Sequence, residues 1–326
     1  MILVDRTSVF GDAASRAGFA GGALRWLLAN LHFFDPPQED TVAAGLAGDN
    51  DGNRRRKAFA ELGALLRLAT RAPAFHDDES VRRLTAWWLA TVRARNFFFD
   101  ARRRDGHYAL RCVAYAVMRS LGEAPAATGR ALQDVLERGR FERLERSAWE
   151  KIDTAYYLDA AGLSHRLGDR RELARASSLA APPSLPYTTN HDLYGITHLL
   201  FHLADFGRVD VSGVLGAALP ALRDYVELAL AMCIAESDWD LAAEFLICRI
   251  CLHAHGAIDL EAGSALREAQ TSSGFIPDRA WLCGLAFPDD VRGRAEMEFF
   301  AVYHPTIVAL FAVVCDMTSE DRRSAE

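Results

Sequence analysis

The sequence has very little lysine. Only Lys57 and Lys151 are lysines among 37 basic residues, and 44 acidic residues bring the formal net charge to −7. Basic residues gather at 54–57 and 102–104, but acidic residues lie nearby, which is typical of solvated helix ends. Because binding to nucleic acid phosphates requires clustered basic side chains, the composition argues against a nucleic-acid-binding surface.

The sequence also lacks closely spaced cysteines and long apolar runs. Its six cysteines lie mostly within apolar stretches, without the spacing of a disulfide framework. No uninterrupted apolar run reaches about 18 residues, and no basic segment followed by an apolar one opens the chain. We therefore expect a reduced cytoplasmic protein with no targeting segment and no membrane partner. Half of the 326 residues are hydrophobic, which is enough for a buried core.

Apolar residues recur at spacings of three and four, as in 23–31, 59–68, 81–89 and 113–121, and no alternating β-branched run competes with them. The sequence thus predicts an all-α fold of about twelve helices. Short connections, with Asp77-Asp78-Glu79 opening one helix and Gly122 closing another, predict antiparallel helical hairpins. Either an α/α toroid or a curved α-solenoid is compatible with this pattern. The later helices are expected near 126–137, 141–165, 170–179, 189–205, 212–235, 239–255, 259–270 and 294–317.

We expect residues 1–326 to form a single helical domain. Residues 180–187 contain three prolines, which exclude a helix there and make this segment the place for any subdivision. Residues 43–53, rich in Gly, Asp and Asn, are expected to form a loop.

Three histidines share one face of the helix predicted at 189–205. His191, His198 and His202 fall within about 40° of one another around the helix axis. Helical rise places His191 about 10 Å from His198, so one metal ion cannot bind all three. His198 and His202, at i and i+4, have the spacing at which two imidazoles share a divalent ion, and a third ligand would come from Asp205, Glu244 or His304. One alternative is that both are buried histidines hydrogen-bonded to neighbouring helices, and another is that His202 is exposed.

An acidic cluster opens the helix predicted at 239–255. Asp240 and Glu244 are at i and i+4, so their charges repel and require compensation by an arginine, a metal ion or a raised pKa of Glu244. Apolar residues follow Glu244, which indicates burial and makes it a candidate general acid or base. The alternative for Asp238 and Asp240 is a simple interaction with the helix dipole.

A third candidate segment surrounds Pro305. Proline is favoured in the first turn of a helix, so we expect a helix to start there and Tyr303 and His304 to lie in the preceding loop. A histidine ahead of a helix N-terminus can bind a carboxylate or phosphate. Cys248, Cys251 and His255 also share a helix face, but the residues between them are typical of ordinary helix packing, not of a zinc site.

Two segments resemble parts of the lanthionine-cyclase-like α/α toroids. Tyr194-Gly195-Ile196-Thr197-His198 is similar to a Gly-x-x-His segment of that family, and Trp281-Leu282-Cys283-Gly284 to a Trp-Cys-x-Gly segment. The Cys-His-Gly element that supplies two of the family's zinc ligands is missing, so the resemblance implies toroid architecture more than zinc-dependent cyclisation. A wider set of residues resembles a group of uncharacterised actinobacterial helical proteins: Asn190-His191-Asp192, Tyr194, Thr197-His198, Asp205-Phe206-Gly207 and Tyr303-His304-Pro305-Thr306.

These patterns together predict a protein of specialised metabolism that processes or binds a small molecule or peptide. In the enzymatic version His191 or His304 is the base and Glu244 the acid, with a divalent metal such as zinc on His198 and His202. The alternative is a non-enzymatic helical-repeat scaffold that binds a peptide or protein partner and needs no convergent polar pocket. The residues expected to line the cavity are His191, Asp192, Tyr194, His198, Asp240, Glu244 and His304.

Overall fold

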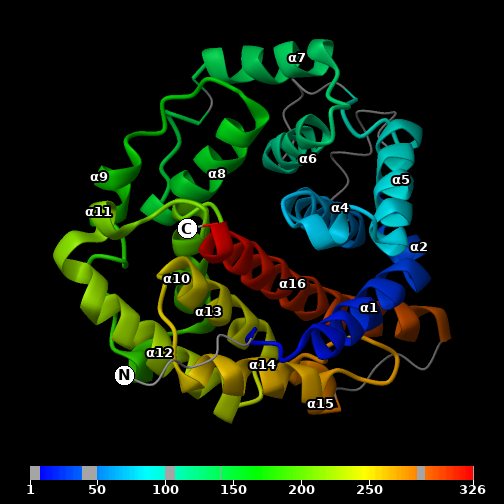
Figure 1. Ribbon diagram of the computed structural model, residues 1–326. Helices are drawn as coiled ribbons and strands as arrows, with labels where there is room; N and C mark the ends of the chain where they lie inside the picture. The colour runs from blue at the N-terminus through cyan, green and yellow to red at the C-terminus, as the bar shows by residue number, and fades with distance from the viewer. Residues whose placement is uncertain (1–7, 39–49, 100–106, 140, 285–290, 326) are drawn as a thin grey trace. The chain divides into compact units, whose positions relative to one another are not determined.

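The computed structural model describes residues 8–38, 50–99, 107–139, 141–284 and 291–325 (Figure 1). Across these ranges the regular elements are helices, apart from one isolated bridge between Ser8 and Gly11, so the prediction of an all-α fold is confirmed. The α-helices are α1 (Ala13–Ala29), α2 (Leu31–Phe34), α4 (Asn50–Ala69), α5 (Glu79–Ala94), α6 (Tyr108–Ser120), α7 (Ala126–Glu137), α8 (Ala148–Ala161), α9 (Arg170–Arg175), α10 (Asn190–Leu203), α11 (Ser212–Leu215), α12 (Leu219–Ala235), α13 (Trp239–Cys251), α14 (Ala257–Ala269), α15 (Arg279–Leu282) and α16 (Val291–Ala325).

Local capping residues set most of the helix ends. Asp78 caps α5 and Gly122, at a φ of 76°, follows α6, as the sequence predicts. Ser147 forms a capping box with Glu150, which starts α8 at Ala148 instead of near residue 141. His253, at a φ of 48°, follows the end of α13 and stops it short of the expected residue 255.

Two expected non-helical segments have different outcomes. Within the loop expected at 43–53, residues 43–49 lie outside the described residues, whereas 50–53 belong to α4, so that part of the prediction is wrong. The proline-rich segment 180–187 carries no α-helix and ends in a short 3-10 helix, Leu185–Tyr187.

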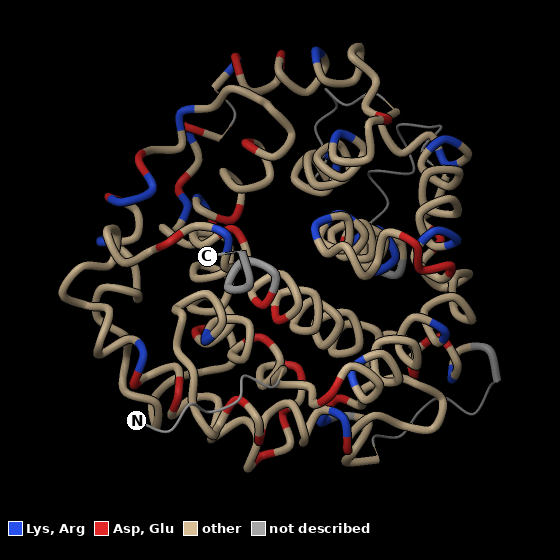
Figure 2. Tube along the Cα trace, in the orientation of Figure 1, with Lys and Arg blue, Asp and Glu red and all other residues tan. Residues whose placement is uncertain are grey.

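The chain divides into two compact units. The middle unit is residues 30–177, and the split unit combines residues 1–29 with 178–326. One boundary therefore lies just before the proline-rich segment; a single domain over 1–326, and the toroid or solenoid arrangement of its hairpins, stay predictions. Basic residues lie among acidic ones along the helices of each unit (Figure 2).

The middle unit has its own aromatic and aliphatic core. Trp88 of α5 stacks on Phe59 of α4 with ring centroids 4.9 Å apart, and its indole N–H donates to the Phe59 carbonyl at 2.9 Å. Helices α6, α7 and α8 enclose a second cluster that includes Leu132, Leu136 and Leu158. These contacts join α4 through α8 without help from the chain termini.

The split unit is built around α13. This helix packs against α10, α12, α14 and α16, and every residue from Asp240 to Cys251 is buried. A helix that is apolar on all sides is stable only when neighbours cover every face. Three charged residues in it, Asp240, Glu244 and Arg249, are therefore buried together with the apolar ones.

Helix α16 does not begin at Pro305, so that prediction is wrong. The helix runs from Val291 to Ala325 with Pro305 inside it, and Tyr303 and His304 lie in its middle, not in a preceding loop. Proline lacks the N–H that would bond to the carbonyl four residues earlier. The next turn is tied down by Thr306, whose hydroxyl donates to the Val302 carbonyl at 2.7 Å and accepts from the Ile276 N–H at 2.9 Å. Packing against α13 and these bonds keep the helix continuous.

The apolar part of α16, Gly293–Glu320, is long enough to cross a membrane. Its 18-residue apolar window has a mean hydropathy of 1.7, but 72% of that window is buried inside the protein. Burial of this kind is what the core helix of a soluble protein shows.

Candidate functional site

The first turn of α10 holds its two candidate residues away from the interior. Thr189 caps the helix, and the Asp192 carboxylate accepts from the Thr189 N–H at 2.9 Å and from its hydroxyl at 2.6 Å. These hydrogen bonds lower the pKa of Asp192. Both His191 and Asp192 are exposed, and Asp192 is engaged in a capping box. The two residues expected at the cavity rim therefore lie at the exposed start of the helix.

The first turn of α13 buries two carboxylates on one side of the helix. Asp238 caps α13 by accepting from the Leu241 N–H at 3.3 Å, directly after Ser237 at a φ of 55°. Asp240 and Glu244 follow, one turn apart, with 9% and 2% of their surfaces exposed. Charges in such surroundings are stable only when polar partners surround them.

Hydroxyl groups from α10 satisfy one oxygen of each carboxylate. The Tyr194 hydroxyl donates to Asp240 Oδ2 at 2.5 Å, and the Thr197 hydroxyl donates to Glu244 Oε2. Tyr194 was expected at the site from the sequence, whereas Thr197 was not singled out. The signal that could have found Thr197 is its position three residues after Tyr194 on the same helix face.

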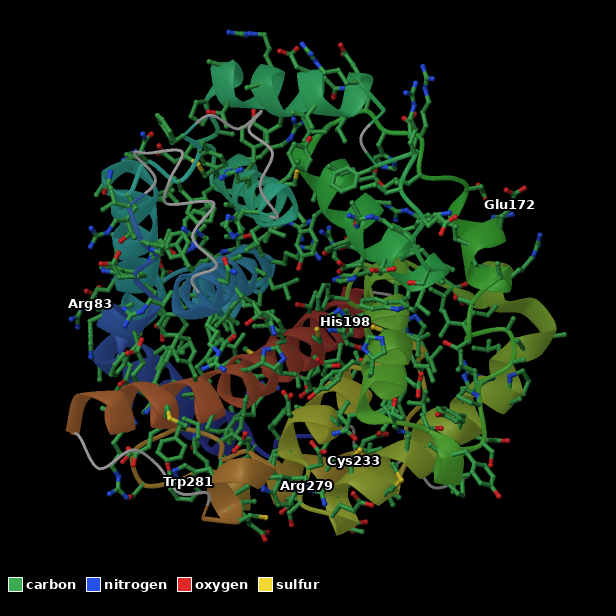
Figure 3. All side chains as sticks on the ribbon, turned by 180° about the vertical axis from the view of Figure 1, so that it is seen from behind. Arg83, Glu172, His198, Cys233, Arg279 and Trp281 are labelled. Atoms are coloured by element: carbon green, nitrogen blue, oxygen red, sulfur yellow. The ribbon has the colours of Figure 1, made fainter. Side chains whose placement is uncertain are left out.

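Two histidines approach the remaining oxygens. His198 Nε2 of α10 lies 3.7 Å from Glu244 Oε1 (His198 is labelled in Figure 3). His304 Nε2 of α16 lies 3.9 Å from Glu244 Oε1 and 3.7 Å from Asp240 Oδ1. The His198 and His304 side chains are 32% and 23% exposed, so they form the accessible side of the group. The acid–histidine cluster is defined here as Tyr194, Thr197, His198, Asp240, Glu244 and His304.

The two carboxylates have opposite pKa shifts. Burial, helped by the charge of Glu244, outweighs the effects of His304 and Tyr194 and raises the pKa of Asp240 to about 6. Burial also acts to raise the pKa of Glu244, but the charges of His198 and His304 and the Thr197 hydrogen bond outweigh it and lower that pKa. The expectation of a raised pKa on Glu244 is therefore wrong. The raised pKa belongs to Asp240, which has fewer donors around it.

His202 lies deeper in α10 than His198 and is only 2% exposed, in contrast to the exposed position considered for it. Its ring centroid is 5.7 Å from that of His198, and it also contacts the rings of Phe201 and Phe206. One ring nitrogen of each histidine lies within 4.8 Å of the other, close to the roughly 4 Å that two nitrogens on one zinc ion can span. The pair could thus supply two ligands of a metal site. Among the third ligands considered, Glu244 approaches this pair, with its Oε1 3.7 Å from His198 Nε2.

The cysteines of α13 are packing residues. Cys248 and Cys251 are fully buried, and burial raises the pKa of the Cys248 thiol well above its ordinary value. The Cys248 thiol donates to the Thr197 carbonyl at 3.7 Å, which ties α13 to α10 below the cluster. The expectation of ordinary helix packing here agrees with this burial.

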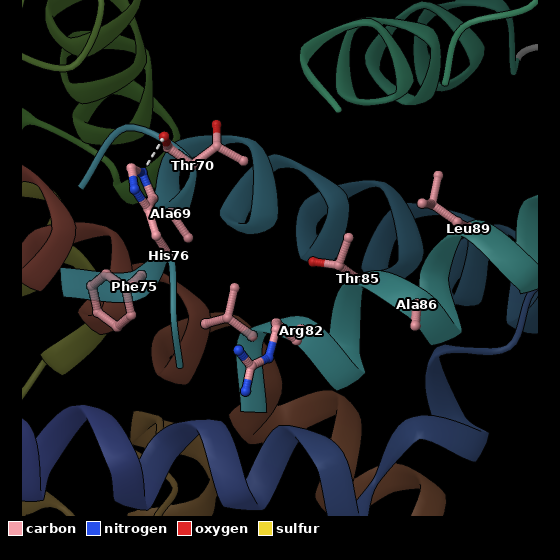
Figure 4. A pocket seen from close by; sticks show the side chains of 9 residues that line it. Ala69, Thr70, Phe75, His76, Arg82, Thr85, Ala86 and Leu89 are labelled. Atoms are coloured by element: carbon pink, nitrogen blue, oxygen red, sulfur yellow. Dashed lines mark hydrogen bonds between the residues drawn. The ribbon is translucent and has the colours of Figure 1, made fainter. Parts of the chain in front are cut away.

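A separate hollow lies in the middle unit and was not foreseen from the sequence. It has a volume of about 500 Å³ and a mainly apolar lining from the end of α4, the 3-10 helix Pro73–Phe75 and α5 (Figure 4). His76 bonds to the Thr70 carbonyl at its edge, at 3.0 Å. Because Arg82, which also lines it, is paired with the exposed Glu79, the hollow offers little charge for specific recognition.

A family model described as a domain of unknown function (DUF6895) matches residues 20–314. The chain belongs to this family. The matched range contains every member of the acid–histidine cluster and the whole of α10 and α13. No curated protein and no solved structure matches the sequence.

Proposed function

We propose that the acid–histidine cluster is a general acid–base site that moves a proton on a small molecule. One observation carries the proposal: His304 Nε2 lies within 4 Å of one oxygen from each of two buried carboxylates on another helix. A scaffold protein needs no such convergence of polar groups from α10, α13 and α16. The middle unit's hollow, which is mainly apolar, does not offer equivalent chemistry.

The environments of the two carboxylates suggest their roles. Glu244 keeps its charge because Thr197 donates to it and two imidazoles face it, so it stabilises a protonated histidine. Asp240, with a pKa of about 6, exchanges its proton near neutral pH. Pairs of titratable groups whose environments separate their pKa values often divide the acid and base roles. We therefore assign the acid role to Asp240 instead of Glu244, and keep His304 as the base.

The substrate would enter on the side of His198 and His304, the more exposed members of the cluster. His304 is more exposed than either carboxylate and lies within 4 Å of both, so a proton taken by its imidazole is stabilised by Glu244 and can be exchanged with Asp240. Tyr194 and Thr197 hold the carboxylates in place as positioning residues, since their hydroxyls bind the oxygens that face away from His304.

Turnover of pooled metabolites tests this proposal. Purified protein is incubated with defined pools of small amines, alcohols, acids and sugars, and consumed compounds are identified by mass spectrometry. For a compound that the wild type consumes, Asp240→Asn and His304→Gln should each lower kcat/KM by about 10²- to 10⁴-fold. His255→Gln, at an exposed histidine after α13, is the matched control and should keep full turnover.

Wild-type turnover in both cluster variants, with helix content confirmed by circular dichroism, would exclude the site. Consumption of no compound from any pool would count against an enzymatic role.

A further inference from the structure

Each carboxylate of the acid–histidine cluster has one oxygen bound and one turned toward the histidines. Tyr194 and Thr197 occupy Asp240 Oδ2 and Glu244 Oε2. Asp240 Oδ1 is buried and accepts no hydrogen bond from any described residue; His304 Nε2, at 3.7 Å, lies beyond hydrogen-bond distance. A buried carboxylate oxygen without a donor is unfavourable, because it has lost water and gained nothing in return. Asp240 Oδ1 therefore remains an acceptor that a donor from a ligand would satisfy.

The cluster is negatively charged when its histidines are neutral, because it contains two carboxylates. After burial, His304 acts most strongly on Asp240, followed by the acidic Glu244 and, more weakly, Asp238. His198 and His304 are the groups that oppose the charge of Glu244. An anionic ligand group would be repelled by both carboxylates, and a hydroxyl brings only one donor.

From this geometry we infer that the acid–histidine cluster binds the primary ammonium group of an amine substrate. This inference rests on the proposed function and specifies its substrate class. A primary ammonium brings a positive charge and three N–H donors, which match the unsatisfied oxygen of Asp240, the Glu244 oxygen that faces the histidines and a neutral imidazole nitrogen of His304.

The distances allow one nitrogen to reach His304 Nε2 together with the facing oxygen of either carboxylate. Two acceptors that are each about 2.9 Å from a shared nitrogen lie less than about 5.8 Å apart. His304 Nε2 meets this limit with both carboxylates, at 3.7 Å from Asp240 Oδ1 and 3.9 Å from Glu244 Oε1. Binding also suits proton transfer, because the histidine and Asp240 would contact the ammonium proton that must leave before the nitrogen can act as a nucleophile.

Four matched probes separate charge from hydrogen bonding. Benzylammonium has both a positive charge and N–H donors, benzyltrimethylammonium has the charge alone, benzyl alcohol has one neutral donor, and benzoate is an anion. Their dissociation constants for the full chain are measured by saturation-transfer NMR at pH 7.5 after treatment with a chelator, so that bound metal does not compete. Benzylammonium should bind at least 10-fold more tightly than each of the other three.

Substitutions of the two carboxylates test whether benzylammonium binds at the cluster. Asp240→Asn and Glu244→Gln keep the side-chain shape and should each weaken benzylammonium binding at least 10-fold. Glu261→Gln removes the same charge from an exposed position on α14 and should bind as the wild type does. Equal binding of benzylammonium and benzyl alcohol to the wild type, or unchanged binding in both cluster variants, overturns the inference.

A measurement on the wild type alone covers the case in which a variant does not fold. Diethyl pyrocarbonate modifies accessible imidazoles, and the modified residues can be mapped by mass spectrometry. Benzylammonium should slow modification of His304 but not of His255, whereas equal rates with and without benzylammonium would contradict the inference.

The outcomes separate this inference from the proposed function. If no amine binds but an alcohol or acid is consumed in an Asp240-dependent way, the substrate class is wrong and the acid–base site stands. If benzylammonium binds as expected but Asp240→Asn and His304→Gln turn over as the wild type does, the binding inference stands and the acid–base function fails.

Discussion

At the scale of single residues, Asp240 and Glu244 lie one helical turn apart, yet their pKa values shift in opposite directions. Both are buried on α13, yet the pKa of Asp240 is raised to about 6 and that of Glu244 is lowered. The difference lies in their partners, since Glu244 receives a hydroxyl and faces two imidazoles whereas Asp240 receives Tyr194 and faces one. Burial therefore dominates for Asp240, and favourable charge interactions dominate for Glu244.

The raised pKa of Asp240 predicts a pH-dependent effect of Asp240→Asn on stability. Between its ordinary pKa of 3.8 and about 6, the folded protein holds a proton on Asp240 that the unfolded chain releases. The contribution of Asp240 to the free energy of unfolding therefore falls as pH rises through this window and stays lost above it. Asparagine has no such loss, so from pH 4 to pH 7.5 the stability of the variant relative to wild type should improve by roughly 2.5 kcal/mol.

Guanidinium unfolding of both proteins at the two pH values measures this difference, with Glu261→Gln as the control variant. The same offset between Asp240→Asn and wild type at pH 4 and pH 7.5 would show that Asp240 has an ordinary pKa.

At the scale of the element, α16 shows packing overriding a local preference. Proline is favoured in the first turn of a helix and disfavoured in its interior, so Pro305 predicts a helix start. The helix nevertheless continues through it, held by α13 and by the bonds of Thr306. Tyr303 consequently stacks on Phe299 one turn earlier, with ring centroids 5.2 Å apart, while His304 faces α13. An anion site at a helix N-terminus is thereby excluded at residues 303–304.

Pro305→Ala should stabilise the protein, by up to about 3 kcal/mol, because alanine restores an N–H to the middle of α16. Pro220 provides the comparison, since it lies in the first turn of α12, where an N–H has no partner within the helix. Pro220→Ala is therefore expected to change stability by less than about 1 kcal/mol. Chemical denaturation of both variants gives the two values. Equal effects at the two positions would mean that α16 does not incur a cost from its interior proline.

At the scale of the whole molecule, the two units are assembled differently. The middle unit is one continuous segment, whereas the split unit joins the first helix to residues from 178 onward. Trp26 of α1 stacks on Phe299 of α16 at 5.8 Å, and the Ser8 hydroxyl donates to the buried Asp316 at 2.5 Å. These contacts link residues at opposite ends of the chain, so the split unit needs both of its segments.

We expect the isolated segment 30–177 to fold, since its core of α4 to α8 is complete within it. Circular dichroism should show high helix content, and urea should unfold the segment cooperatively. The segment 178–326 is the control and should unfold without cooperativity, because it lacks α1 and Ser8. Cooperative unfolding of the control, or its absence in 30–177, would contradict this assignment of the cores.

Much of the fold follows from local pattern. The helix at 126–137 is found with the predicted bounds, and Asp78 begins and Gly122 ends a helix as expected, because capping depends on neighbouring residues alone. Boundaries fail where the deciding interaction is less evident from spacing, as at Ser147, whose capping box shortens α8. The continuation through Pro305 depends on another helix, so local pattern could not reveal it.

The candidate site, like the fold, could be predicted only in part from the local sequence pattern. Sequence period and composition are enough to show that His198, Asp240, Glu244 and His304 are polar residues in apolar helical surroundings, because both are local properties. The packing of α10, α13 and α16 is what brings them together with Tyr194 and Thr197, leaves His191 and Asp192 outside and gives Asp240 the raised pKa. Burial and charge act over a few ångströms in space, so they depend on which helices meet, not on spacing along the chain.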